Sequence, residues 1–147
     1  KLDRVKKGVN IGILIAMAGT LIIVVPLMCF SDTMLKLFNS DPEVLRYGRM
    51  FVLYMSPFYI PYCATQIYSG ALRGAGDSLS PMIVTIASFV VFRQLYLLLG
   101  TQFISSPLFV GLSYPAGWIV STITLFIIYR SGRWEKKLPA HVRMQAA

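Results

Sequence analysis

The segment GALRGAGDS (residues 70–78) brings an arginine and an aspartate together with three glycines. Glycine-rich loops of this kind cradle phosphate groups when their residues follow a fixed spacing. This segment has no lysine after its last glycine, as G-x-x-x-x-G-K-[ST] requires, and it does not match G-x-G-x-x-G. We therefore interpret it as a tight turn between two apolar segments, with its aspartate as a cap. We expect Gly74 and Gly76 to adopt positive φ angles, and Ser80 and Pro81 to start the next helix.

Aromatic and polar side chains recur at helical spacing between residues 54 and 69. The set consists of Tyr54, Phe58, Tyr62, Thr65 or Gln66, and Ser69. Spacings of three and four residues place such a set on one helix face, and Pro57 and Pro61 interrupt the backbone hydrogen bonds of the same helix. A kinked helix with an aromatic face suits a cavity wall, because aromatic rings attract organic cations. Ordinary helix packing is the alternative, and we predict that Tyr54, Tyr62 and Gln66 line a cavity.

Arg93 is the one charged residue within the apolar segment of residues 81–100. An arginine near the centre of a membrane costs about 2.5–3.5 kcal/mol on insertion scales, so it needs a partner. No acidic residue lies within the apolar segments of the chain. We therefore expect Arg93 to contact backbone carbonyl groups, an outer loop or a part of the protein beyond these segments. We count it among the cavity-lining candidates, with a structural clamp on carbonyl groups as the alternative.

The cysteine and histidine residues indicate neither a metal site nor a nucleophilic site. Cys29 and Cys63 lie inside apolar segments without metal-ligand spacing, and the single histidine, His141, lies in a polar tail. A membrane enzyme needs clustered His, Asp or Cys side chains at one membrane face, and the sequence shows no such cluster. We therefore expect no enzymatic activity, no metal and no cofactor.

Four apolar segments occupy most of the chain, at residues 8–30, 50–72, 81–100 and 108–128. A helix of about 20 apolar residues crosses the hydrocarbon core of a bilayer. Of the 147 residues, 56% are hydrophobic and 14% are charged. A soluble protein would need polar faces on these helices. The sequence therefore predicts an all-α fold, a polytopic membrane helical bundle with four transmembrane helices at about residues 8–30, 44–72, 80–100 and 108–130.

The basic residues predict how this bundle is oriented. The net charge of +8 is concentrated at the ends of the apolar segments. If all four segments span, residues 1–7, the turn at residues 70–78 and residues 130–143 share one side. By the positive-inside rule, both termini are then cytoplasmic in a multi-pass protein of the inner (plasma) membrane. We interpret residues 135–147 as a cytoplasmic tail near anionic lipid, and expect no nucleic-acid partner.

Five motifs follow one another along residues 1–134. They are the basic start KLDRVKKGV, the connector LKLFNSDPEVLRYGRMFV, the G-x-L-R-G-x-G-D-[ST] turn, the segment SLSPMIVTIASFVVFRQLYLLL with its embedded arginine, and YPAGWIVSTITLFIIYRSGRW. In this order they resemble the multidrug and toxic-compound extrusion (MATE) transporters. Those transporters have twelve helices in two six-helix lobes, and the chain is similar to helices nine to twelve. The resemblance implies that residues 1–134 form part of the C-terminal lobe, and we expect the chain, which starts with lysine, to be a piece of a longer protein.

The resemblance implies a secondary-active antiporter that exports amphipathic or cationic drugs and toxic compounds in exchange for H⁺ or Na⁺. Its partners would be small organic molecules, the lipid bilayer and the N-terminal lobe of the same protein. A lipid-linked oligosaccharide flippase of the same superfamily is the alternative, although such a cavity should hold more cations than Arg93. Some relatives carry a carboxylate in the helix that matches residues 50–72, where this chain offers Gln66. We therefore expect the coupling carboxylate upstream of this chain.

Overall fold

The computed structural model describes residues 2–100, 102–103 and 106–134, and every regular element in this part of the chain is helical. The elements are α1 (Leu2–Cys29), α2 (Ser31–Lys36), α3 (Pro42–Met55), the 3₁₀ turn η1 (Ser56–Phe58), α4 (Tyr59–Gly74), α5 (Leu79–Ile86), the π-helical η2 (Ala87–Phe92), α6 (Arg93–Gly100) and α7 (Pro107–Arg130). The predicted all-α membrane bundle is confirmed. The tail predicted at residues 135–147 lies outside the described residues.

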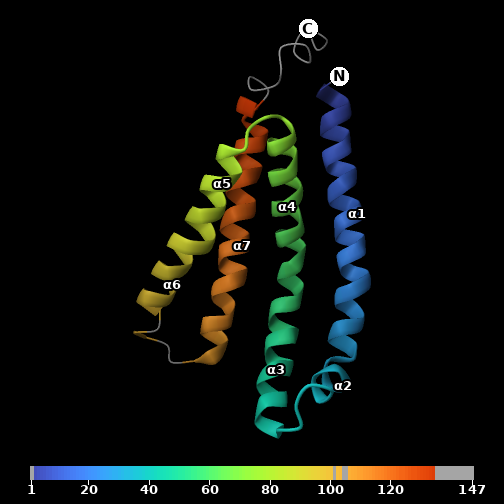
Figure 1. Cartoon of the computed structure of the whole chain (residues 1–147), viewed down its shortest axis with the longest axis vertical. Coiled ribbons are helices and arrows are strands. Elements are labelled where there is room, and N and C mark those ends of the chain that lie inside the picture. The colour runs from blue at the N-terminus through green and yellow to red at the C-terminus, as the bar shows by residue number, and fades with distance from the viewer. Residues whose placement is uncertain (1, 101, 104–105, 135–147) are drawn as a thin grey trace.

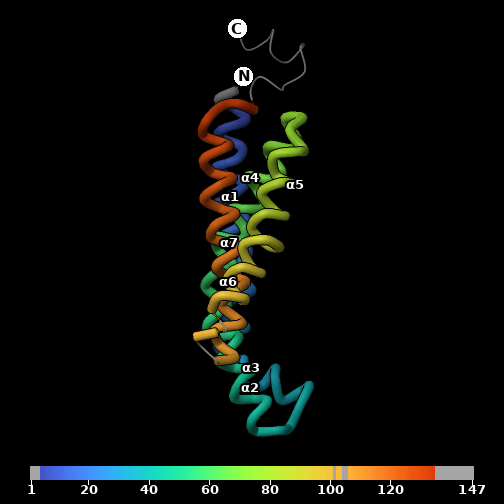
Figure 2. The backbone as a smooth tube through the Cα atoms, turned by 90° about the vertical axis from the view of Figure 1, so that its left-hand side faces the viewer, coloured from blue at the N-terminus to red at the C-terminus, as the bar shows by residue number. Residues whose placement is uncertain are grey.

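The long helices form a row rather than a closed bundle. Helix α4 packs between α1 and α7, and the continuous path α5–η2–α6 packs against α7 and crosses it at a slant (Figure 1). In the perpendicular view α1, α4 and α7 overlap, whereas α5 diverges from α7 at one end (Figure 2). The start of α1, the α4–α5 turn and the end of α7 all lie at the same end of the molecule. We call this the basic end.

Three helical segments of the described chain have the length and apolar composition of membrane spans. They are Arg4–Cys29, Leu79–Gly100 and Pro107–Arg130. The second predicted span, at about residues 44–72, follows the path α3–η1–α4 but is divided at Ser56–Phe58. Pro57 causes this division, because proline has no N–H to donate to the preceding turn. Pro61 falls in the first turn of α4, where the N–H groups have no helical partner in any case.

The turn at residues 70–78 is tight, but its details differ from those predicted. Gly76 has a positive φ of 89°, whereas Gly74 is the last residue of α4 and has no positive φ. Asp77 N donates to Leu72 O at 2.9 Å and Gly76 N donates to Arg73 O at 3.0 Å. These two bonds make a Schellman motif, which satisfies the last carbonyl groups of the helix.

The start of α5 also differs from the prediction. The helix begins at Leu79, so that Ser80 and Pro81 lie within its first turn and Ser80 is not the cap. Asp77 accepts hydrogen bonds from Ser80 N at 3.2 Å and from Ser80 Oγ at 2.7 Å. The predicted capping role of the aspartate is therefore confirmed, because a carboxylate near a helix start satisfies its unpaired N–H groups.

Small residues of α7 form the interior of the row. The buried residues of this helix are Gly111, Ser113, Pro115, Gly117, Ser121 and Leu125. Small residues let helix backbones approach closely in a membrane. A Cβ atom on Gly117 would lie 3.1 Å from the carbonyl oxygen of Ser88, and one on Gly111 would collide with the Phe51 ring. The path of η2 beside α7 therefore depends on Gly117.

Hydroxyl groups join α4 to α7 in the middle of the row. Thr65 Oγ1 lies 2.7 Å from Thr122 Oγ1, which lies 2.7 Å from Pro61 O. Thr122 has one hydroxyl proton, which it donates either to Pro61 O or to Trp118 O in its own helix, also at 2.7 Å. The network gives the backbone of α4 near its prolines a partner on another helix, as the hydrocarbon core requires.

Most charged residues of the described chain lie near one end of the row or the other. The basic end holds Arg4, Lys6, Lys7, Arg73, Arg130 and Arg133, with Asp3 near the start of α1 and Asp77 in the turn. At the opposite end Lys36, Arg46 and Arg49 accompany Asp32, Asp41 and Glu43. Arg49 Nη1 lies 3.2 Å from Asp32 Oδ2, and both side chains are more than half exposed. A net positive charge therefore marks one end only among the described residues.

Candidate functional site

The cavity that contains Arg93 lies where α4, η2, α6 and α7 meet. Its volume is ≈ 260 Å³, and it is lined by Tyr62, Phe89, Arg93, Ser113, Tyr114, Gly117 and Trp118. Four of these seven residues are aromatic, and the lining carries one formal charge. Ligand cavities are commonly lined by aromatic side chains with a few placed polar groups. The cavity therefore suits an amphipathic molecule.

Arg93 is held by two residues of α7. Its Nε donates to Ser113 Oγ at 3.3 Å, and its guanidinium carbon lies 3.7 Å from the centre of the Tyr114 ring. Ser113 is fully buried, and its Oγ donates to Val110 O at 2.6 Å. The hydroxyl therefore accepts from the arginine while giving its own proton to the helix backbone. A cation over an aromatic ring is stabilised by the ring quadrupole.

These contacts differ from the partners that we predicted for Arg93. The partners are a hydroxyl and an aromatic face of the neighbouring helix, rather than backbone carbonyl groups or an outer loop. Among the described residues, none accepts a hydrogen bond from the Nη atoms of Arg93. A guanidinium carries five N–H donors, so four remain for a bound molecule or water. Arg93 is thus held in place by α7 and still has N–H groups with which it can bind another molecule.

Trp118 forms the aromatic wall between the cavity and α4. Its ring centre lies 5.1 Å from that of Tyr62 and 5.3 Å from that of Tyr59, with both ring pairs tilted. Aromatic pairs at such distances favour offset or tilted arrangements, which hold the rings in place. A second cavity of ≈ 370 Å³ is also lined by Tyr62, together with residues that include Thr20 and Cys63. Tyr62 therefore borders two cavities.

The structure brings together two of the four predicted cavity residues. Tyr62 and Arg93 line the same cavity, although they lie on different helices. Tyr54 and Gln66 are exposed and do not line it. Within the predicted face, Thr65 and Ser69 are instead buried. The face is therefore split between the packing interface with α7 and the outer surface of the row, and a role for Tyr54 and Gln66 stays a prediction.

The sequence prediction missed Phe89 of η2 and four lining residues of α7: Ser113, Tyr114, Gly117 and Trp118. A signal was present, because Tyr114 and Trp118 lie one turn apart and directly follow the small residues Ser113 and Gly117. Small residues at helical spacing mark the face on which a membrane helix packs. Large aromatic residues next to that face line the cavities that remain between the packed helices.

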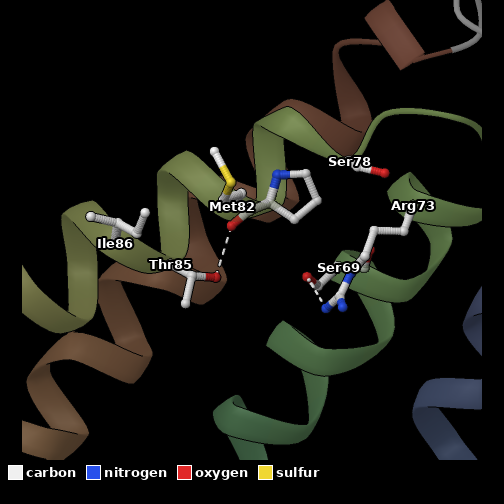
Figure 3. Close-up of a pocket in the computed structure, with 7 residues that line it drawn as sticks. Ser69, Arg73, Ser78, Met82, Thr85 and Ile86 are labelled. Carbon is white, nitrogen blue, oxygen red and sulfur yellow. Dashed lines mark hydrogen bonds between the residues drawn. The ribbon is translucent and has the colours of Figure 1, made fainter.

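A separate cavity of ≈ 280 Å³ lies under the α4–α5 turn (Figure 3). Arg73 reaches back along its own helix there, and its Nη2 donates to Ser69 Oγ at 2.9 Å. On the facing helix, Thr85 Oγ1 donates to Pro81 O at 2.7 Å. Both polar side chains thus bond their own helices, in keeping with the structural interpretation of the turn.

Metal-binding and acid–base groups do not gather within residues 2–100, 102–103 and 106–134. No group of three or more His, Cys, Asp or Glu residues there is placed to hold a metal ion. The aromatic cavity likewise has no carboxylate or histidine in its lining. Its lining offers a bound molecule aromatic contacts and one guanidinium.

Comparison with known proteins gives a consistent family match. The MatE family model matches residues 1–98. The probable multidrug resistance protein YpnP of Bacillus subtilis (strain 168) is 26% identical over 106 residues, which are 72% of this chain and 24% of the relative. The probable multidrug resistance protein NorM of Thermotoga maritima is 29% identical over 116 residues, 74% of this chain and 24% of the relative.

A further relative aligns with nearly the whole chain. The probable multidrug resistance protein YoeA of Bacillus subtilis (strain 168) is 28% identical over 140 residues, 93% of this chain and 30% of the relative. The chain thus spans less than a third of the length of each of these relatives. No solved structure gives a significant match.

Proposed function

The chain belongs to the MatE family, and on this premise we propose that it is part of a secondary-active multidrug exporter. It supplies the equivalent of helices nine to twelve of twelve, in the C-terminal lobe. The complete protein exports amphipathic or cationic compounds in exchange for H⁺ or Na⁺. The names of the relatives as probable multidrug resistance proteins support the export of drugs.

The observation that carries this proposal is the aromatic cavity around Arg93 in a membrane helical bundle. Tyr62, Phe89 and Trp118 provide contact area for the apolar body of a substrate. The free N–H donors of Arg93 bind an oxygen atom of its polar part. A site with aromatic walls and one anchored donor discriminates weakly between apolar bodies, which suits a multidrug exporter.

We propose that the basic end faces the cytoplasm of a cell whose inner membrane holds the protein. The excess of arginine and lysine at this end supports that orientation. The proton or sodium carboxylate then belongs to the remainder of the transporter, since the lining of the aromatic cavity includes none. The division of the second span at Ser56–Phe58 provides a bend that suits alternating access.

A flippase for lipid-linked oligosaccharides is the second candidate. The guanidinium of Arg93 in the cavity favours it, because such substrates carry phosphate groups that arginine binds well. The single charge in the lining favours the exporter instead. The two candidates differ in whether an ion gradient moves an organic dye.

Gradient-driven dye efflux by the complete transporter in proteoliposomes tests the proposal. A proton gradient and a sodium gradient are imposed separately, and export of a fluorescent organic cation is followed. We expect one gradient to drive export. The absence of export of every dye under both gradients would contradict the exporter and favour the flippase.

Variants of the same protein connect the activity to the cavity. We expect Tyr62→Ala and Trp118→Ala to reduce export at least several-fold, because each removes one aromatic wall. Leu98→Ala is the matched control, since Leu98 is 62% exposed and lies outside the cavity. Gln66→Ala tests the remaining prediction for α4. Equal losses in Trp118→Ala and Leu98→Ala would show that substrate binds elsewhere.

A further inference from the structure

A pocket not yet described lies between α1, α4 and α7 at the basic end, and its lining is rich in aromatic residues. Its volume is ≈ 270 Å³, and it is lined by Lys6, Asn10, Tyr68, Phe126, Tyr129 and Arg130. The residues come from three helices at regular spacing, with Lys6 and Asn10 one turn apart on α1. None of the six is acidic. The pocket is distinct from the aromatic cavity around Arg93, with which it shares no residue.

The aromatic rings of this pocket form a continuous cluster. Tyr68 lies edge-on to Phe126, with ring centres 5.8 Å apart, and its centre is 5.3 Å from that of Tyr129. Tyr129 stacks on the buried Trp134, with ring centres 5.3 Å apart. Trp134 Nε1 donates to Tyr129 O at 2.8 Å, which holds this ring pair against the end of α7. The four rings therefore form a packed aromatic cluster on one side of the pocket. Tyr and Trp side chains are enriched at membrane–water interfaces.

Two basic side chains from different helices border this aromatic cluster. Lys6 and Arg130 are both exposed, and the guanidinium carbon of Arg130 lies 6.0 Å from the centre of the Phe126 ring. Asn10 adds an amide that donates hydrogen bonds. Cations on two helices and an amide in the same pocket provide hydrogen-bond donors for a phosphate group, and those of the cations are charge-assisted.

The position of the pocket indicates where such a phosphate would come from. Lys6 and Arg130 lie within two turns of the ends of their helices, where apolar spans emerge from the membrane. About two turns deeper on the same faces lie Leu14 and Ile123, which are 66% and 53% exposed. Cations at the water interface above an exposed apolar path match the layout of a phospholipid, with its headgroup above its acyl chains.

We propose that this pocket binds the headgroup phosphate of an anionic phospholipid. Lys6, Asn10 and Arg130 hold the phosphate, the aromatic cluster supports the glycerol region, and the acyl chains follow Leu14 and Ile123. The lipid thereby ties α1 to α7, which have α4 between them. This binding does not depend on which compounds the protein transports.

Native mass spectrometry of the complete transporter tests the proposal through retained lipid. The protein is purified from nanodiscs of phosphatidylglycerol and phosphatidylcholine, and bound lipids are counted. We expect preferential retention of phosphatidylglycerol, and roughly a tenfold loss of it in Lys6→Gln/Arg130→Gln, because two cations near the membrane surface are removed. Lys6→Arg/Arg130→Lys should keep the lipid, which distinguishes a charge effect from misfolding.

The matched control removes the same charge from the same end. Lys7 and Arg133 are exposed and do not line the pocket, so Lys7→Gln/Arg133→Gln should retain phosphatidylglycerol. Equal losses in the two double variants would overturn the proposal and leave only a diffuse surface charge. Equal retention of phosphatidylcholine would overturn it as well. Displacement of the lipid by millimolar inorganic phosphate would contradict a lipid site and indicate a site for free anions.

Discussion

At the scale of the residue, Arg93 would determine what the aromatic cavity accepts in the proposed exporter. Its guanidinium covers Tyr114, so that ring is already engaged by a cation. Two unit charges ~6 Å apart repel by about 3 kcal/mol at an effective dielectric constant of about 20. A cationic substrate must therefore bind with its charge away from Arg93, whereas an acceptor oxygen gains by approaching it. Ser113 holds the arginine in place and keeps this preference fixed.

We predict that Arg93→Gln improves the apparent KM for monovalent organic cations by about tenfold to a hundredfold relative to zwitterionic compounds, the upper figure applying to charges ~6 Å apart. The substitution removes the repulsion and keeps a hydrogen-bonding amide. Competition between a cationic dye and a zwitterionic compound in the proteoliposome assay measures the ratio. Arg93→Lys keeps the charge and should leave the ratio near that of the parent. A parallel change for both compounds in Arg93→Gln would contradict this view.

Thr122 gives a second prediction at the residue scale. Its hydroxyl connects α7 to Thr65 and to Pro61 O of α4. We predict that Thr122→Val destabilises the protein by about 0.6–1.7 kcal/mol, the range found for hydrogen bonds between membrane helices. Thermal unfolding in detergent, followed by tryptophan fluorescence, measures the change. Thr124 bonds only Val120 O of its own helix, so Thr124→Val is the control and should change Tm less.

At the scale of the element, α7 organises the other helices. Its small residues allow η2 and α4 to approach, and the space beside them becomes the aromatic cavity around Arg93. The π-helical turn of η2 places the carbonyl of Ser88 against Gly117. π-Helical turns inside α-helices occur frequently at functional sites. The path of α5–η2–α6 across α7, and with it the position of Arg93, depends on this contact.

We predict that Gly117→Ala lowers the stability of the protein by about 1–3 kcal/mol, the usual cost of overpacking. The new methyl group would lie 3.1 Å from a backbone oxygen, which cannot move without shifting η2. Gly19→Ala is the control, since nothing lies within 4 Å of a Cβ at that position. The two variants are compared by Tm and by dye export. An equal Tm in both would show that η2 adapts to the extra methyl group.

At the scale of the whole molecule, the described chain is a row of helices with broad apolar faces. Helix α1 exposes more than half of Ile11, Leu14, Ile15, Ile22 and Ile23. Exposed apolar surface of this extent belongs against lipid or against another part of a protein. The chain spans less than a third of the length of its relatives. Contact of these faces with lipid and contact with the remainder of the protein are therefore both consistent with the proposed transporter.

The orientation of the row gives a prediction at this scale. The complete transporter is prepared with its native cysteines, including Cys29 and Cys63, replaced by serine, and one new cysteine is introduced at a time. We expect a membrane-impermeant maleimide to label Asn39→Cys in intact cells, and Ser131→Cys only after lysis, if the basic end faces the cytoplasm as we propose. Both positions are exposed, so access to the reagent is comparable. The reverse labelling pattern would contradict the proposed orientation.

The sequence alone determined the helical class, the approximate spans and the collection of positive charge at one end. These follow from the chain itself, because a backbone in hydrocarbon must satisfy its own hydrogen bonds and therefore forms helices where apolar residues persist. Prolines also act locally, so the break near Pro57 was predictable. The turn was predictable as a turn, although Gly74 and Gly76 could not be told apart until the end of α4 was known.

Which residues share a site depends on how the helices pack together. Arg93 meets Ser113 and Tyr114 twenty residues along the chain, and Tyr62 joins them from a third helix. Helical spacing predicted a face through Tyr54, Tyr62 and Gln66, but it carries no information on which neighbour covers that face. The rotation of α4 against α7 buries Thr65 and leaves Gln66 exposed. That rotation is set by the close packing of side chains from distant segments, which local sequence does not encode.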